Sequence, residues 1–241
     1  MLLKVCLNGA RTRTEHAAVP LTPADLAQAA QVSLAAGAGA IHMHPRDGSG
    51  AQSLAAGDIG AAVAAVRAAC PGVPLGVSTL FSILPDPARR AAAVSEWTIL
   101  PDFASVNFGE SGTPELCAAL DALGVGIEAG LDTPAAAEAY VRAGMVGRCL
   151  RVLLEPGEET TAAALATVAA IEAILEAADD TTPRLLHGGD TAAWTLIDAA
   201  AARGYDTRIG LEDVLTLPDG SAAHDNAALV AAAVGRLGAL R

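Results

Sequence analysis

Two histidines separated by one residue, His42 and His44, stand at the end of a short apolar run and directly before a Pro-Arg-Asp segment. In a β-strand, alternate side chains point to the same face, so both imidazoles would lie side by side. Paired imidazoles on one face form half of a divalent-metal site. A lone His-x-His is about as typical of a polar strand end whose histidines are solvated or satisfied in the core. The strands and helices around the pair distinguish between these interpretations.

Short β-branched runs alternate with alanine-rich segments along the whole chain. The pattern predicts strands over residues 3–7, 40–43, 74–77, 103–107, 125–129, 150–154, 184–186 and 207–211. It predicts helices over residues 23–36, 58–69, 86–97, 113–123, 133–143, 161–178, 191–203 and 222–237. Helix starts are indicated by Thr22 before Pro23, by Asp58, by Thr113 and Thr133 before prolines, and by Thr160 or Thr161.

Eight strand–helix units without a linker predict one α/β domain over residues 1–241, a (β/α)8 TIM barrel. An open, doubly wound sheet is the alternative. It usually has fewer strands and a glycine-rich fingerprint after the first strand, where this chain has Asn-Gly-Ala-Arg.

Composition narrows the range of partners and compartments. The net charge is −12 and no basic cluster occurs, which argues against nucleic acid or an anionic membrane as the main partner. The four cysteines show neither a C-x-x-C motif nor disulfide-framework spacing, as expected for buried thiols in a reducing cytoplasm. The N-terminal segment is interpreted as a first strand instead of a signal peptide, so we expect a cytoplasmic protein.

In a barrel of this kind, catalytic groups lie where the strands end. Closure of the barrel places the eighth strand beside the first, and the first beside the second, so Glu212 would lie one strand away from His42 and His44. Two imidazoles and one carboxylate form a plausible divalent-metal site with open coordination positions, as in catalytic zinc sites. The same set could also hold iron(II).

Arg208 and Asp213 follow at the same strand end. An arginine beside a carboxyl group keeps it ionised, so Asp213 could accept a proton from a substrate directly or through water. A salt bridge at the rim of the barrel is the alternative interpretation.

Further polar groups stand at the other strand ends. His187-Gly188-Gly189 precedes a helix and predicts either an anion site or a simple glycine turn. Ser78 and Thr79 have no base partner in the sequence, so they are interpreted as hydrogen-bond donors to a substrate. Glu128 and Glu155 are both expected to face the pocket, which favours a cationic group on the substrate.

Three segments together carry a resemblance. The run from Cys6 to His16, the run from Ile41 to Asp47 and the run from Arg208 to Asp213 resemble the β-keto acid cleavage enzymes, typified by 3-keto-5-aminohexanoate cleavage enzyme. The segment from Asn226 also fits the last helix of that family. The resemblance covers most of the chain, although the usual member is longer and continues beyond the position of Arg241.

The resemblance implies a zinc-dependent TIM barrel that forms homo-oligomers (dimers or tetramers) and condenses a β-keto acid with acetyl-CoA to give acetoacetate and a new acyl-CoA. It implies that His42, His44 and Glu212 hold one zinc ion per chain. Arg208 and Asp213 would be the pair that activates a water to deprotonate the substrate, and Glu15 and Glu128 match acidic positions of the family pocket. The implied substrate-binding positions are Ser78 or Thr79, and Asn107. Asn107 and Glu155 stand where the family is expected to carry other residues, so the identity of the keto acid stays open.

Two other functions fit part of the pattern. Amidohydrolase-type zinc hydrolases also place a His-x-His in a barrel, but on the first strand and with further histidine and aspartate ligands later in the chain. A metal-stabilised barrel without catalysis would keep the three ligands but has no need of the Arg208–Asp213 pair. The presence of both sets favours the enzyme.

Overall fold

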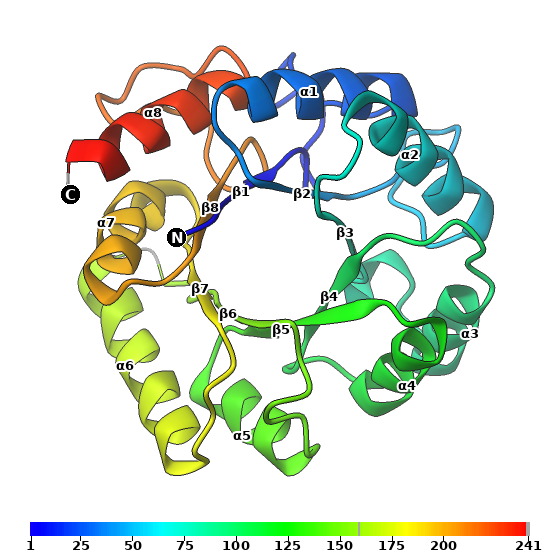
Figure 1. Cartoon of the computed structure of the whole chain (residues 1–241), viewed down its shortest axis with the longest axis vertical. Helices are drawn as coiled ribbons and strands as arrows, with labels where there is room; N and C mark the ends of the chain where they lie inside the picture. Colours follow the sequence, from blue (N-terminus) through cyan, green and yellow to red (C-terminus); the bar gives the residue numbers. More distant parts are fainter. Residues whose placement is uncertain (159, 240–241) are drawn as a thin grey trace.

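Eight parallel strands surround a central axis and helices cover their outer face in the computed structural model, which describes residues 1–158 and 160–239 (Figure 1). The strands are β1 (Leu3–Cys6), β2 (Ala40–Met43), β3 (Leu75–Ser78), β4 (Phe103–Asn107), β5 (Gly126–Leu131), β6 (Arg151–Leu154), β7 (Arg184–Leu186) and β8 (Thr207–Ile209). Their order in the sheet is β7-β6-β5-β4-β3-β2-β1-β8. A parallel bridge between Leu185 and Asp206 joins the two ends of the sheet, so the predicted single-domain (β/α)8 barrel is confirmed as nearly closed.

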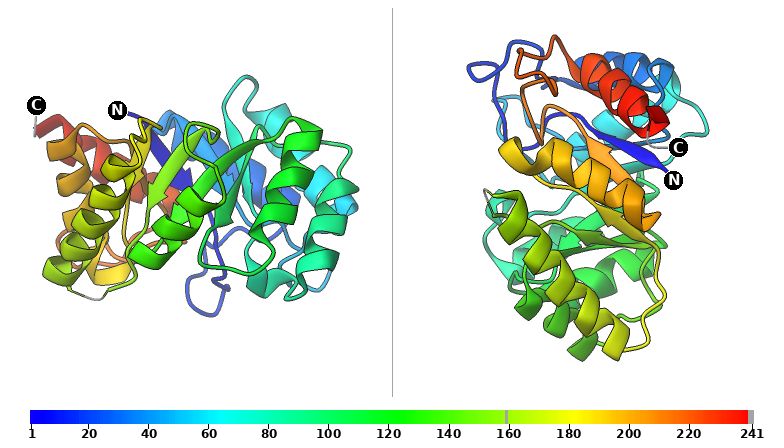
Figure 2. Two further views of the ribbon diagram at one scale, coloured as in Figure 1. Left: turned by 90° about the horizontal axis from the view of Figure 1, so that it is seen from below. Right: turned by 90° about the vertical axis from the view of Figure 1, so that its left-hand side faces the viewer.

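The helices alternate with the strands, as the sequence pattern predicts. They are α1 (Pro23–Ala35), α2 (Ala56–Ala69), α3 (Pro87–Ser95), α4 (Thr113–Leu123), α5 (Pro134–Arg142), α6 (Thr161–Ala177), α7 (Ala193–Arg203) and α8 (Asn226–Ala239), with short 3₁₀ turns η1 (Phe81–Ile83) and η2 (Asp190–Ala192). No helix within the described residues has both the length and the apolar character needed to cross a membrane. The loop between β1 and α1, in dark blue, extends beyond the barrel on the side where the strands end (Figure 2).

Helix starts follow the predicted caps in most cases. The side chains of Thr22, Thr133 and Thr160 each accept a hydrogen bond from a backbone N–H in the first turn of their helix. Thr113 is the first residue of α4 and follows Gly112 at the cap position. The prediction for Asp58 is wrong, because α2 begins earlier, at Ala56, and the Asp58 carboxylate instead accepts a hydrogen bond from the Ser53 hydroxyl at 2.5 Å.

The start of the last helix and the ends of two strands differ from the prediction by two residues or more. Helix α8 begins four residues later than residue 222, because Leu217 and Ser221 close a turn around Gly220, which has a φ of +84°. Strand β5 continues to Leu131, two residues beyond its predicted end, and β8 ends at Ile209 instead of residue 211. The extension of β5 has a direct effect on which carboxylate reaches the mouth of the barrel.

The alternation of side chains along β1 separates the two faces of the barrel wall. Leu3, Val5 and Leu7 belong to the apolar core between strands and helices. Lys4 lies on the other face, where its ammonium group pairs with Glu128 inside the barrel and stands 5.5 Å from the centre of the Phe103 ring. These three side chains are almost completely buried and fill the barrel beneath the strand ends.

A candidate metal and acid–base site

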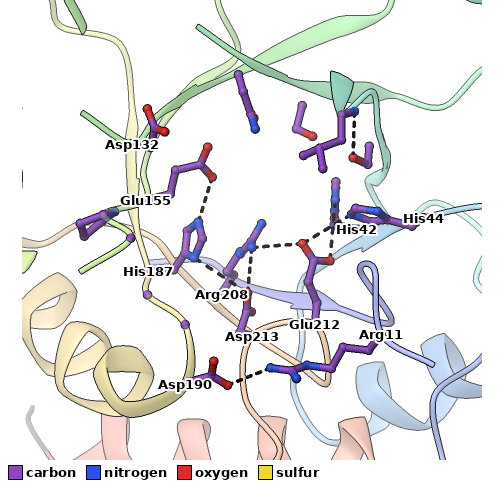
Figure 3. Close-up of a pocket in the computed structure, with 18 residues that line it drawn as sticks. Arg11, His42, His44, Asp132, Glu155, His187, Asp190, Arg208, Glu212 and Asp213 are labelled. Carbon is purple, nitrogen blue, oxygen red and sulfur yellow. Dashed lines mark hydrogen bonds and ion pairs between the residues drawn. The ribbon is translucent and has the colours of Figure 1, made fainter. Parts of the chain in front are cut away.

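A cavity of about 400 Å³ opens at the carboxyl ends of the strands (Figure 3). Its wall is built by residues that follow or end each strand, together with the loop after β1. The position agrees with the general location of active sites in (β/α)8 barrels. The predicted site residues are therefore expected to line this cavity.

Three potential metal ligands meet on one side of this cavity. Nε2 of His44 lies 3.5 Å from Oε1 of Glu212, and Nε2 of His42 lies 3.9 Å from Oε2 of Glu212. One ligand atom from each of the three side chains lies within 4.8 Å of the others. Strand β1 stands between β2 and β8, so the predicted closure brings these residues together.

The protonation states of His42 and Glu212 suit a cation. Burial, acting against the nearby Glu212 carboxylate, lowers the pKa of His42 well below its usual value, so its imidazole is neutral. Burial alone would raise the pKa of Glu212, but Arg208 and the two histidines hold it well below its usual value. Among the described residues, Oε2 of Glu212 has no hydrogen-bond partner although it is buried. A buried, ionised oxygen without a donor is costly unless a cation neutralises it, so these residues fit a divalent metal.

Neighbouring groups orient the ligands. Nδ1 of His44 is hydrogen-bonded to the Gln52 side-chain oxygen, so Nδ1 carries the proton and Nε2 presents its lone pair toward Glu212. The Asn8 side chain donates to the His44 carbonyl at 2.9 Å and accepts from the His44 N–H at 2.8 Å, which fixes the end of β2. Gly9, with a φ of +52°, leaves room for Glu212, because a Cβ there would lie 2.5 Å from Cγ of that glutamate.

An ion pair at the base of the cavity adjoins the ligand set. Nη2 of Arg208 donates to Oδ1 of Asp213 at 2.7 Å and to Oε1 of Glu212 at 3.2 Å. Burial raises the pKa of Asp213 in spite of the opposing charge of Arg208. Asp213 is therefore a carboxylate whose affinity for a proton is increased, beside the potential metal site.

A second polar pair lies across the cavity. Nε2 of His187 is 3.2 Å from Oε2 of Glu155, and Nδ1 of the same ring faces Oδ1 of Asp213 at 3.9 Å (Figure 3). Burial raises the pKa of Glu155 to about 7. Burial, and then the charge of Arg208, lowers the pKa of His187 to about 3. At neutral pH the imidazole is uncharged, and the carboxyl group of Glu155 is close to the midpoint of its titration.

Most of the predicted site residues line the cavity. They are His42, His44, Ser78, Asn107, Glu155, His187, Gly188, Gly189, Arg208, Glu212 and Asp213. Thr79 is buried beside them but does not line it, because its hydroxyl donates to the Ser105 carbonyl at 2.6 Å. The amide of Asp190, after the two glycines, donates to the Asp213 carbonyl at 2.8 Å instead of facing the cavity.

The prediction that Glu15 and Glu128 face the pocket is wrong. Glu15 lies in an exposed turn, where its carboxylate accepts a hydrogen bond from the Thr12 N–H at 2.8 Å. Glu128 is buried below the cavity and pairs with Lys4 and Arg151. The reason is the length of β5: the strand continues to Leu131, so Glu128 stays inside the barrel, and Asp132, which follows the strand on the same face, reaches the mouth.

Sequence reasoning missed other residues of the cavity wall. Asp132 and Ser105 also line it, and both could have been found from the period of two along β5 and β4. Nη2 of Arg11 lies 2.8 Å from Oδ1 of Asp190, an ion pair that joins the loop after β1 to the turn after β7 at the mouth (Figure 3). No spacing in the sequence indicates that pair, because it depends on how two loops fold.

Comparison with known proteins gives one match over the full length of the chain. The model of the beta-keto acid cleavage enzyme (BKACE) family matches residues 1–241. No protein of the curated set matches.

Several solved structures have a similar fold. The ternary complex of ObcA with a C4-CoA adduct and oxalate has a TM-score of 0.72 and 19% identity, covering 92% of this chain and 64% of that one. The binary complex of ObcA with oxaloacetate has a TM-score of 0.71 and 18% identity, covering 90% and 63%. A 3-dehydroquinate dehydratase from Geobacillus kaustophilus has a TM-score of 0.64 and 8% identity, covering 99% and 89%. The chain thus spans less than two thirds of the ObcA chain, and at these identities the likeness concerns the fold.

Proposed function

The chain belongs to the beta-keto acid cleavage enzyme family, and from this premise we propose that it condenses a β-keto acid with acetyl-CoA and releases acetoacetate and a new acyl-CoA. The observation that carries the proposal is the position of the His42, His44 and Glu212 ligand set directly beside the Arg208–Asp213 pair in one cavity. We further propose zinc as the metal, one per chain, in a homo-oligomeric cytoplasmic enzyme.

The ligands named in the neighbouring structures support this substrate class. ObcA binds oxaloacetate, which is a β-keto acid, and a C4-CoA adduct. A cavity of about 400 Å³ is large enough for a small keto acid together with the acetyl end of a thioester.

Different residues of this chain have different roles in the proposed reaction. Once bound at His42, His44 and Glu212, a divalent metal supplies Lewis-acid stabilisation of negative charge on substrate oxygens. Asp213 accepts the proton from the carbon between the keto and carboxylate groups, because burial increases its proton affinity while Arg208 fixes its orientation. Ser78 and Asn107 line the opposite wall and serve as hydrogen-bonding groups to the substrate.

The bond changes then follow a condensation and a reverse Claisen cleavage. The carbanion attacks the thioester carbonyl of acetyl-CoA, and the C–S bond breaks. The released thiol attacks the original keto carbon, the C–C bond breaks, and acetoacetate leaves after it takes back the proton held by Asp213. Protons and electrons are conserved over the cycle, so no oxidant or reductant is needed.

The proposal is tested by a panel of β-keto acids incubated with acetyl-CoA, with acetoacetate as the product measured and elemental analysis as a parallel assay. We expect acetoacetate formation with at least one keto acid and about one zinc ion per chain. The control is His42→Ala, which should lose both the metal and the turnover. Absence of turnover across the panel together with hydrolysis of a lactone or amide would indicate an amidohydrolase-type activity instead.

A further inference from the structure

Glu155 stands on the wall of the cavity opposite the metal-ligand set, and one of its carboxyl oxygens is held by His187 (Figure 3). Its Oε2 is fixed by Nε2 of His187 at 3.2 Å. Its Oε1 lies above Gly130, where a Cβ would come within 2.2 Å of it and within 2.6 Å of the Asn107 side-chain oxygen. Gly130 therefore provides the space in which Glu155 leans into the cavity.

The two oxygens of this carboxyl group have different surroundings. Oε2 is bonded to His187, whereas Oε1 has no protein partner among the described residues and is absent from the buried, unpaired polar atoms. Oε1 is thus accessible from the cavity. A carboxyl group with one oxygen fixed and the other open to a ligand has the geometry of a general acid or base.

Charged groups from several strands surround Glu155 and set its protonation. Burial is the largest influence and favours the neutral acid, and Asp132 after β5 and Glu212 after β8 act in the same direction. Arg208 in β8 and Lys4 in β1 favour the carboxylate. His187 after β7 is neutral, so it holds the group without adding a charge. The pKa of about 7 means that Glu155 can give and take a proton near neutral pH.

The proposed reaction requires two separate proton transfers. Asp213 holds the proton from the carbon acid from the first step until acetoacetate is released. During that interval the sulfur of coenzyme A leaves the acetyl carbon and later attacks the keto carbon. A free thiol has a pKa of about 8.5, so its departure and its return both need a proton partner. The proton taken by Asp213 returns to the acetoacetate carbon at the end of the cycle, so a second group has to serve the sulfur.

We propose that Glu155 is the acid–base residue for the coenzyme A sulfur, an inference that depends on the proposed function. As the C–S bond of acetyl-CoA breaks, the proton on Oε1 of Glu155 moves to the departing sulfur. When the sulfur attacks the keto carbon, the thiol proton returns to Glu155, which ends the cycle in its starting state. His187 is a positioning residue that keeps Oε2 fixed during both transfers.

The experiment compares Glu155→Gln with the wild-type enzyme in three assays. Glutamine keeps the shape and can still bond to His187 but cannot transfer a proton. Exchange of the α-protons of the keto acid with deuterated water, followed by NMR, should remain within a few-fold of the wild-type rate, because it depends on Asp213. Turnover with acetyl-CoA should fall by about 10²–10⁴-fold. The inflection of kcat near pH 7 in the wild type should disappear in the variant.

A change of leaving group gives the decisive comparison. With the acetyl thioester of an acidic aryl thiol, whose sulfur leaves and attacks without a proton partner, the loss caused by Glu155→Gln should shrink to less than about tenfold. The matched control is Glu138→Gln, an exposed carboxylate on α5 that should behave as wild type in every assay.

The outcomes separate the two proposals. An equal loss with both thioesters, or a parallel loss of α-proton exchange, would overturn the role of Glu155 and assign it to positioning or stability. If the wild-type enzyme shows neither exchange nor turnover with any keto acid, the proposed function itself fails.

Discussion

At the scale of single residues, the buried pair of His187 and Glu155 reverses the usual order of proton affinities. Burial lowers the pKa of His187 from 6.5 to about 3 and raises that of Glu155 from 4.5 to about 7. Between pH 4.5 and 6.5 the native pair carries its proton on the carboxyl group, whereas the unfolded chain carries it on the imidazole. Each state then holds one proton, so the pair adds no pH dependence to stability in this range.

Substituting either Glu155 or His187 should reveal the pH dependence of stability that the other residue causes. In His187→Gln only Glu155 remains. Its raised pKa stabilises the native state fully below pH 4.5, and this stabilisation is lost as the pH rises through about 7. At about 1.4 kcal/mol per pKa unit, we expect the free energy of unfolding to fall by on the order of 3 kcal/mol relative to wild type over that range. In Glu155→Gln only His187 remains, so stability should fall as the pH decreases from 6.5 toward 3.

Urea unfolding of the wild type and both variants at stepped pH measures these slopes. If the free energy of unfolding changed with pH in the same way in all three proteins, the assignment of the proton to Glu155 would be contradicted.

Asp213 and Glu212 are adjacent in the chain but have different expected roles. Asp213→Asn removes the proton acceptor while it keeps the size of the side chain, so turnover should fall by about 10²–10⁴-fold. The metal content should stay unchanged, because the ligand atoms come from Glu212 and the two histidines. Elemental analysis of the purified variant provides the check, and loss of the metal would instead make Asp213 a ligand.

At the scale of elements, the end of β8 passes very close to β1. A Cβ on Gly210 would lie 1.9 Å from the backbone oxygen of Cys6, a contact that only backbone movement could relieve. We expect Gly210→Ala to destabilise the protein by more than about 3 kcal/mol and to displace Glu212 from the histidines, with loss of metal. Thermal unfolding and metal content test this. Gly57→Ala is the control, since nothing lies within 4 Å of a Cβ there, and unchanged stability in both variants would contradict the close approach.

The predicted element boundaries explain what the sequence could and could not reveal. Strands β2, β4 and β7 match their predicted ranges, because apolar runs bounded by glycine, proline or charged residues leave few alternatives. The neighbourhood of Glu212 and the two histidines follows from closure of the barrel alone. In contrast, the predicted end of β5 was two residues too early, so Glu128 was expected at the mouth, where the structure has Asp132. The Arg11–Asp190 pair depends on loop conformations that no periodic pattern predicts.

At the scale of the whole molecule, the ligand set connects two strands that are far apart in the chain. His42 and His44 belong to β2 and its end, whereas Glu212 follows β8, so a bound metal links the first and last parts of the barrel. Removal of the metal should therefore lower stability throughout the molecule. A ligand at a thousand times its Kd contributes about 4 kcal/mol, which corresponds to roughly 10 °C in Tm for a domain of this size.

Differential scanning calorimetry with and without a chelator tests this effect. His42→Ala should already have the lower Tm and should not respond to the chelator. An identical response in that variant and in the wild type would show that the chelated metal is bound elsewhere.

The charged and aromatic filling of the lower barrel has a kinetic consequence. Lys4, Glu128 and Phe103 close the cavity from below, so substrates and products share the opening at the strand ends. For the proposed reaction, the long arm of coenzyme A would obstruct that opening, and the small keto acid has to enter first. The order of addition should then be fixed: initial-rate plots should intersect, and acetoacetate, the last product to leave, should compete with the keto acid but not with acetyl-CoA. Binding of acetyl-CoA to the free enzyme, measured by equilibrium dialysis without keto acid, would mean that the opening admits both substrates independently.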